Sequence, residues 1–178
     1  TRLAMVHFST MRAALEAVHA LLQSGPTAIE LIDKMMLDLA RDRIEYRRLL
    51  TFVEGDPEVV LIVEYSGDAE AELDAGVERL GGVLKRIRHR EPVENLADYV
   101  DGVFDIATRA GLGKVAIYAH ASAGCLHLRP LINLKTRDGI RQLREIEEAV
   151  IELTLGLGGA VSGEHGQGLA RGEFTERI

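Results

Sequence analysis

Apolar residues along this 178-residue chain follow two different periods. Strict alternation predicts half-buried strands, and recurrence every three to four residues predicts amphipathic helices. Apolar runs rich in strand-forming residues predict strands at residues 2–8, 59–65, 114–121 and 125–134. The helical period predicts helices at residues 10–23, 27–43 (with a ragged extension to 50), 69–84, 94–110 and 136–156. The second helix is predicted from apolar residues that would share one helical face: Ile29, Ile32, Met36 and Leu39.

The order of these elements predicts the fold class. Two units of strand and then helix are followed by a further helix and by two strands in close succession. Two strands joined by a tight turn must be antiparallel. We therefore expect an α+β fold, a ferredoxin-like antiparallel or mixed sheet of about four strands with helices packed on one face. The length fits one domain with a sizeable core or at most two small ones, and we expect a single α+β domain over residues 1–178. Because the chain starts without methionine and ends in mid-pattern, we expect it to be a piece of a larger protein.

Composition narrows the class of protein. The net charge of −7 argues against a nucleic-acid-binding surface. The basic run Lys85–Arg90 is more typical of a solvated loop than of a binding patch. A single cysteine, Cys125, excludes an internal disulfide and indicates a reducing, cytoplasmic compartment. The chain has no apolar run of the roughly 20 residues that a membrane span needs, although peripheral attachment of the parent protein to the inner membrane stays open.

Two histidines lie in the predicted hairpin, whose sequence over residues 118–130 is YAHASAGCLHLRP. If Ala123 and Gly124 form a two-residue turn, His120 and His127 are directly opposite each other, with Cβ atoms roughly 5 Å apart. That separation suits two imidazoles that bind one metal ion. The alternative is that both histidines simply form a polar rim of the hairpin. Cys125 flanks the turn and is interpreted as a small turn residue rather than a ligand.

A second chemically suggestive stretch, SGEHGQGLARG, covers residues 162–172. Glu164 offers a third metal ligand, and two histidines with one carboxylate leave coordination positions open, as catalytic metal sites do. His165 cannot easily share an ion that Glu164 binds, so it is interpreted as a catalytic acid or base. Without the histidine pair, the same loop would be interpreted as a turn followed by a helix cap.

The hairpin HASAGCLHLRPLINL and the loop GGAVSGEHGQGLAR together resemble the C-terminal domain of FAD-linked oxidases, and the segment TAIELID resembles a helix start of that family. The family includes the flavin subunit of glycolate oxidase, D-lactate dehydrogenases and D-2-hydroxyglutarate dehydrogenases. The hairpin looks most like that of long members in which the flavin portion is fused to an iron–sulfur portion. An iron–sulfur cluster in the parent protein is therefore one open expectation.

The resemblance implies a cap domain that closes over the flavin ring of FAD. It implies a divalent metal, often zinc, on the residues that match His120, His127 and Glu164, where the metal binds the carboxylate and hydroxyl of a D-2-hydroxy acid. The residue that matches His165 takes the hydroxyl proton while hydride leaves for flavin N5. The close backbone approach that glycines allow would leave room for the flat flavin ring; these glycines are Gly163, Gly166 and Gly168.

Two departures from the family pattern affect these expectations. The family usually carries a longer stretch before the helix that precedes the hairpin, with a tryptophan and a substrate-binding arginine. Here Leu84 runs almost directly to Pro92, and the chain has no tryptophan. The family's FAD-binding domain is also not part of this sequence, so we expect FAD to be bound mainly by that domain of the parent chain and the isolated fragment to be inactive.

The leading hypothesis is a substrate and cap domain of a flavin-dependent D-2-hydroxy-acid dehydrogenase of the glycolate or lactate type. Its expected partners are a small 2-hydroxy acid and the FAD-binding domain, with no nucleic acid. One alternative is a stand-alone α+β module that binds a metal or a small ligand without redox activity. A further alternative, a regulatory effector-binding domain, gives no reason for the neighbouring Glu164 and His165.

Overall fold

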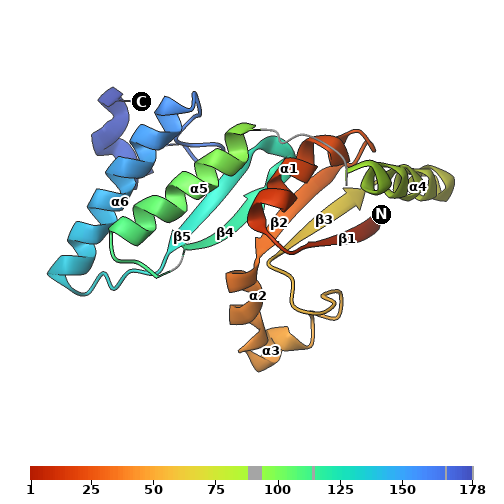
Figure 1. Cartoon of the computed structure of the whole chain (residues 1–178), viewed down its shortest axis with the longest axis horizontal. Helices are drawn as coiled ribbons and strands as arrows, with labels where there is room; N and C mark the ends of the chain where they lie inside the picture. The colour runs from red at the N-terminus through yellow and green to blue at the C-terminus, as the bar shows by residue number, and fades with distance from the viewer. Residues whose placement is uncertain (88–93, 114, 167, 178) are drawn as a thin grey trace. The chain divides into compact units, whose positions relative to one another are not determined.

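The computed structural model describes residues 1–87, 94–113, 115–166 and 168–177 (Figure 1). These residues form two compact units. The first comprises Thr1–Ala97 and Ala116–His127, and the second comprises Asp98–Val115 and Leu128–Ile178. The strands are β1 (Arg2–Phe8), β2 (Ala28–Asp33), β3 (Val59–Tyr65), β4 (Val115–His120) and β5 (Cys125–Pro130). The helices are α1 (Met11–Leu22), α2 (Lys34–Arg41), α3 (Ile44–Arg47), α4 (Glu70–Ile87), α5 (Glu94–Arg109), α6 (Arg137–Gly156) and α7 (Gly168–Arg171), with short 3-10 turns η1 (Ala121–Ala123) and η2 (Gly172–Arg177).

The sheet has the strand order β1-β3-β2-β4-β5. Strand β3 pairs antiparallel with both β1 and β2, and β2 also pairs antiparallel with β4. β3 lies inside the sheet, and its run of β-branched and aromatic residues, VVLIVEY, is almost entirely buried. The predicted α+β class is confirmed, with five strands in place of about four.

Helices α1 and α4 contact each other and both contact β1 and β3, so they cover one face of this part of the sheet (Figure 1). Helix α1 begins after Thr10, whose hydroxyl accepts a hydrogen bond from the backbone N–H of Ala13 at 3.2 Å. The core of the first unit is aliphatic, and its largest fully buried side chains include Leu21, Ile29, Leu31, Leu61 and Ile117.

Residues 27–43 do not form the single helix that the spacing predicted. Residues 28–33 form strand β2, with Ile29 and Leu31 fully buried and on one face of the sheet. Helix α2 begins only after Asp33, whose carboxylate caps the helix by accepting a hydrogen bond from the N–H of Met36 at 2.8 Å. The helical spacing arose by chance from one strand and one helix in succession, and pairing with β3 and β4 decides the conformation of the first half.

The second unit is built on α5 and α6. Its buried cluster contains Val103, Ala107 and Val115, against which partly buried apolar side chains pack: Tyr99, Phe104, Leu112, Leu128, Val150 and Leu153. The two helices approach closely at Gly102, where an added Cβ would lie 2.7 Å from a methyl carbon of Leu153. Thr136 caps α6, since its hydroxyl accepts a hydrogen bond from the N–H of Gly139 at 3.0 Å.

Three sequence predictions touch residues outside the described part. The basic run Lys85–Arg90 and the short connection from Leu84 to Pro92 overlap residues 88–93, which are not described, and the predicted start of the third strand falls on Lys114. Among the described helices, none is long and apolar enough to span a membrane.

Candidate metal centre

The hairpin between β4 and β5 turns differently from the prediction. β4 ends at His120 and β5 begins at Cys125, so residues 121–124 form the connection, and the predicted two-residue turn is wrong. The first three of these residues adopt the 3-10 turn η1, closed by Gly124 at φ 67°. The N–H of Ile29 in β2 donates a hydrogen bond of 3.2 Å to the hydroxyl of Ser122, which ties the longer turn to the sheet.

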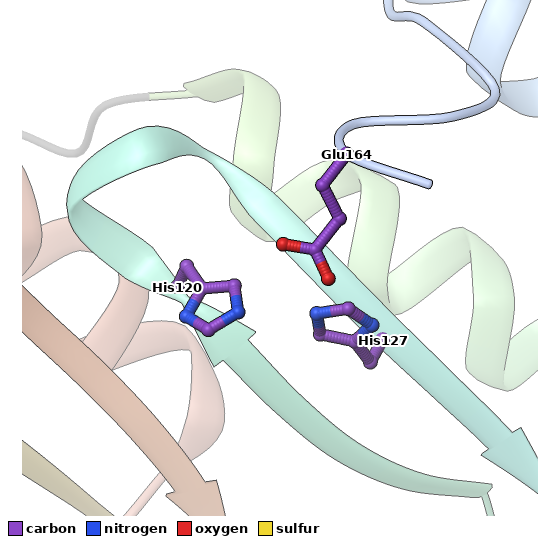
Figure 2. Close-up of side chains that lie close together, drawn as sticks. All are labelled: His120, His127 and Glu164. Carbon is purple, nitrogen blue, oxygen red and sulfur yellow. The ribbon is translucent and has the colours of Figure 1, made fainter. Parts of the chain in front are cut away.

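The longer turn still brings the two histidines together within the first unit. The ring centroids of His120 and His127 lie 5.3 Å apart with the planes at 87° (Figure 2). A ring nitrogen of His120 lies within 4.8 Å of a ring nitrogen of His127. Two imidazole nitrogens on one tetrahedral ion would be roughly 3.3 Å apart, given metal–nitrogen distances of about 2.05 Å. The two distances differ by about 1.5 Å at most, which small rotations of the two side chains can remove.

Two residues that the sequence reasoning missed hold His120 in place. Nδ1 of His120 lies 3.0 Å from Oε1 and 2.8 Å from Oε2 of Glu30. Glu30 is the register partner of His120 across the β2–β4 pair. The hydroxyl of Tyr118 donates a hydrogen bond of 2.8 Å to Oε2 of the same carboxylate. The Tyr118 ring lies edge-on to His120, with centroids 5.3 Å apart, and is stacked with His127 at 5.6 Å and 29°.

Asp33 anchors β4 close to this cluster. Its side chain is buried, and Oδ2 accepts a hydrogen bond of 2.7 Å from the N–H of Ile117, while Oδ1 caps helix α2. Burial raises the pKa of Asp33 above its ordinary value, although the two backbone hydrogen bonds lower it in part. Asp33 therefore joins the end of β2, the start of α2 and the middle of β4 in one buried contact.

The loop with Glu164 and His165 belongs to the second unit. Nε2 of His165 lies 2.6 Å from Oε1 of Glu164, and the His165 side chain is 80% exposed. The hydroxyl of Ser162 donates a hydrogen bond of 2.9 Å to the carbonyl of Gly166, which closes the loop on itself. The guanidinium of Arg171 donates a hydrogen bond of 3.2 Å to the carbonyl of Val161. The carboxylate of Glu164 and the imidazole of His165, the two candidate functional groups of this loop, thus lie in direct contact.

The glycines of this loop have a local conformational reason. Gly166 and Gly168 have φ values of +68° and +59°, a backbone region that side chains with a Cβ rarely adopt. Among the described residues, no atom lies within 4 Å of a Cβ built on either of them. Gly163 precedes Glu164 in the same loop. The predicted role of these three glycines beside a flavin stays a prediction.

The structure thus places the predicted site residues in two pairs. His120 and His127 lie together in the first unit, and Glu164 and His165 lie together in the second (Figure 2 shows both hairpin histidines and Glu164). Glu30 had no sequence signal of its own, because the run Ala28–Asp33 alternates between buried and half-buried positions only through its pairing with β3 and β4. Because this segment was predicted as a helix, the position of Glu30 beside His120 was not predicted.

Comparison with known proteins identifies relatives over the whole chain. The family described as FAD linked oxidases, C-terminal domain, matches residues 1–89 and 91–178. D-2-hydroxyglutarate dehydrogenase of Pseudomonas putida is 28% identical over 219 residues, which cover 96% of this chain and 22% of that protein. The enzyme of the same name from Escherichia coli is 26% identical and covers 98% of this chain and 22% of its own length. Glycolate oxidase subunit GlcD of Bacillus subtilis is 26% identical over 85 residues, which are 48% of this chain and 18% of that protein.

The matches also show which part of the relatives this chain covers. The chain spans about a fifth of the length of the long relatives that it matches. The alignment with the Pseudomonas putida protein is longer than this chain, so that relative carries residues without a counterpart here. The family match is interrupted at residue 90, in the connection where the sequence departs from the family pattern.

Proposed function

Because this chain belongs to the family of FAD-linked oxidase C-terminal domains, we propose that it is the substrate and cap portion of a flavin-dependent enzyme that oxidises a D-2-hydroxy acid. The names of its relatives, D-2-hydroxyglutarate dehydrogenase and glycolate oxidase subunit, support this substrate class. The observation that carries the proposal is that the rings of His120 and His127 lie close together on the hairpin and that Glu30 orients His120.

The residues present fit a divalent metal ion. By their chemistry, His120 and His127 would supply two imidazole nitrogens and Glu164 one carboxylate oxygen, a donor set that suits zinc and leaves positions open for substrate. A carboxylate accepts hydrogen bonds, so Glu30 fixes the proton of His120 on Nδ1 and leaves Nε2 as the ligand atom. When bound, the ion would supply positive charge that lowers the pKa of a substrate hydroxyl.

His165 is assigned the role of the base that accepts the hydroxyl proton. Its high exposure leaves the ring accessible to a substrate, and its contact with Oε1 of Glu164 holds the ring in one orientation. A carboxylate hydrogen-bonded to an imidazole also stabilises the imidazolium that forms when the proton is taken. Glu164 would thus both orient His165 and supply the carboxylate of the metal donor set. FAD, held mainly by another domain of the parent protein, would supply the electron acceptor.

The test uses the full-length parent protein and follows flavin reduction by a panel of D-2-hydroxy acids. His165→Ala should abolish reduction while the flavin stays bound, and His19→Ala, which changes an exposed histidine of α1, should leave the rate unchanged. Near-normal reduction by His165→Ala would overturn the assignment of the base. Reduction of the flavin by none of the acids in the wild type would overturn the substrate class.

A separate measurement addresses the metal. Elemental analysis should find one divalent ion per chain in the wild type and little in a variant that combines His120→Ala with His127→Ala. Equal metal content in the two proteins would remove the metal from the proposal and leave the base assignment to be judged on flavin reduction alone.

A further inference from the structure

The carboxylate of Glu30 faces His120 from the neighbouring strand, and nothing in the sequence motifs points to it. We propose that Glu30 is a positioning residue, which holds His120 in the tautomer and the orientation that a metal ligand needs. The inference rests on the proposed function, because it assigns Glu30 a role toward the ion that His120 and His127 would bind.

The geometry at Glu30 is that of an orienting contact. Both of its carboxylate oxygens lie within 3.0 Å of Nδ1 of His120, and the Glu30 side chain is only 28% exposed. Partial burial of a charge costs free energy unless hydrogen-bond partners compensate for it, and His120 is such a partner for this carboxylate. Here the hydroxyl of Tyr118 adds a second hydrogen bond to Oε2, which fixes the carboxylate itself. The carboxylate of Glu30 and the hydroxyl of Tyr118, from two paired strands, therefore determine where the His120 ring points.

The contact also selects a tautomer. A neutral imidazole carries its proton on one nitrogen and a lone pair on the other, and an ionised carboxylate can only accept. Nδ1 of His120 must therefore carry the proton, and Nε2 must carry the lone pair. Ligand histidines in metal sites commonly donate their other N–H to a carboxylate in this way, and loss of that partner typically costs 10–100-fold in metal affinity.

The competing explanation is a cross-strand pair that stabilises the sheet without any role toward a ligand. Such pairs contribute roughly 0.2–1 kcal/mol, and the loss of a purely structural pair lowers the free energy of unfolding without changing the affinity of the folded protein for a metal ion. The two explanations therefore differ in the zinc affinity of a Glu30 variant, and a first measurement without metal tests whether Glu30 sets the proton position of His120 at all.

That measurement is the imidazole 15N–1H correlation spectrum of the metal-free full-length protein. His120 of the wild type should give the nitrogen shifts of a ring protonated at Nδ1, and Glu30→Ala should move it toward a mixture of both tautomers. Glu30→Gln is nearly isosteric and keeps an acceptor oxygen, so it should retain most of the Nδ1–H form. An unchanged His120 spectrum in a folded Glu30→Ala protein would overturn the inference.

The second measurement is zinc affinity, determined by competition with a chromophoric chelator. Glu30→Ala should raise the zinc Kd about 10–100-fold, and Glu30→Gln should raise it less. Glu64→Ala is the matched control: Glu64 is a half-buried strand glutamate of β3 that accepts a hydrogen bond from Ser66, and its removal should leave the Kd unchanged.

The outcomes separate this inference from the function on which it rests. If His120→Ala leaves zinc binding at the wild-type level, the metal centre itself is wrong. If His120→Ala abolishes binding but Glu30→Ala lowers stability and leaves the Kd unchanged, Glu30 is a structural cross-strand residue and the inference fails. Loss of affinity in Glu30→Ala with partial recovery in Glu30→Gln supports the positioning role.

Discussion

Removal of the Asp33 side chain should loosen the junction at which β2, α2 and β4 meet. The carboxylate accepts a hydrogen bond from the N–H of Met36, which caps α2, and a second one from the N–H of Ile117 in β4. Asp33→Ala removes both acceptors at once. Asp33→Asn keeps a single acceptor oxygen, so it can satisfy one of the two N–H groups and must place an amide nitrogen toward the other.

The magnitude follows from these two contacts. Loss of an N-cap side chain costs about 1 kcal/mol, and a buried N–H left without its acceptor costs about 1–3 kcal/mol. Part of this loss is returned, because the buried carboxylate no longer has to be desolvated on folding, as its raised pKa indicates. We expect Asp33→Ala to lower the free energy of unfolding by about 2–3 kcal/mol, and Asp33→Asn to lower it by roughly half as much.

The assay is urea-induced unfolding followed by far-UV circular dichroism, with the variants compared at one pH. Asp42→Asn serves as the control, because Asp42 is an exposed residue at the other end of α2 and should change stability by less than about 0.5 kcal/mol. If both Asp33 variants unfold within about 0.5 kcal/mol of the wild type, the two backbone hydrogen bonds do not stabilise this junction and the reasoning is refuted.

The pH dependence at Asp33 has a definite sign. Because its pKa is raised in the folded state, the folded protein binds this proton more tightly than the unfolded chain does. The stability contributed by this group is therefore fully present below the unfolded pKa, near the ordinary value of 3.8, and falls as pH rises through the folded pKa. The stability difference between wild type and Asp33→Asn should decrease over that interval and stay constant above it. An increase with pH over the same interval would contradict the sign.

The remaining predictions concern glycines on helices and can be measured by thermal unfolding. Gly76→Ala should destabilise the protein by about 1–3 kcal/mol, because the new Cβ would lie 2.5 Å from the buried ring of Tyr65. Gly82→Ala on the same helix meets no described atom within 4 Å and should stabilise it by about 0.5–1 kcal/mol; equal effects of the two would refute the packing argument. Gly139→Ala should cost more than Gly76→Ala, since its Cβ would collide with the rigid backbone carbonyl of Asn133 rather than with a side chain.

The parts of the fold that the sequence predicted correctly are those in which local pattern and final burial agree. Strand β3 is a short apolar run bounded by turns, and α6 carries both a capping threonine and a clear helical period. Residues 28–41 show the opposite case. There the local spacing matched a helix throughout, but hydrogen bonds to two other strands made the first half a strand. Such pairing depends on residues far along the chain and leaves no local signal.

In the candidate site too, features set by a short stretch of sequence could be predicted, and features set by distant residues could not. His120 and His127 are seven residues apart, and Glu164 and His165 are adjacent, so each pair could be predicted from a short stretch. The length of the hairpin turn could not, because the 3-10 turn is held by Ser122 on a backbone N–H of β2. Glu30 could not be predicted either, since it reaches His120 across 90 residues of sequence and lies in the segment whose conformation was mistaken.

Because Glu30 and His120 are far apart in the sequence, we expect the two parts of the site to form at different stages of folding. The hairpin closes over a few residues and can form within microseconds, so its two rings can meet early, even in a partly folded chain. The carboxylate arrives only when strands far apart in the polypeptide have paired, which is intrinsically slow because a long loop must first be closed. If the histidine pair binds an ion as proposed, an ion captured by a nascent chain would be bound weakly at first and tightly only once the whole sheet had formed.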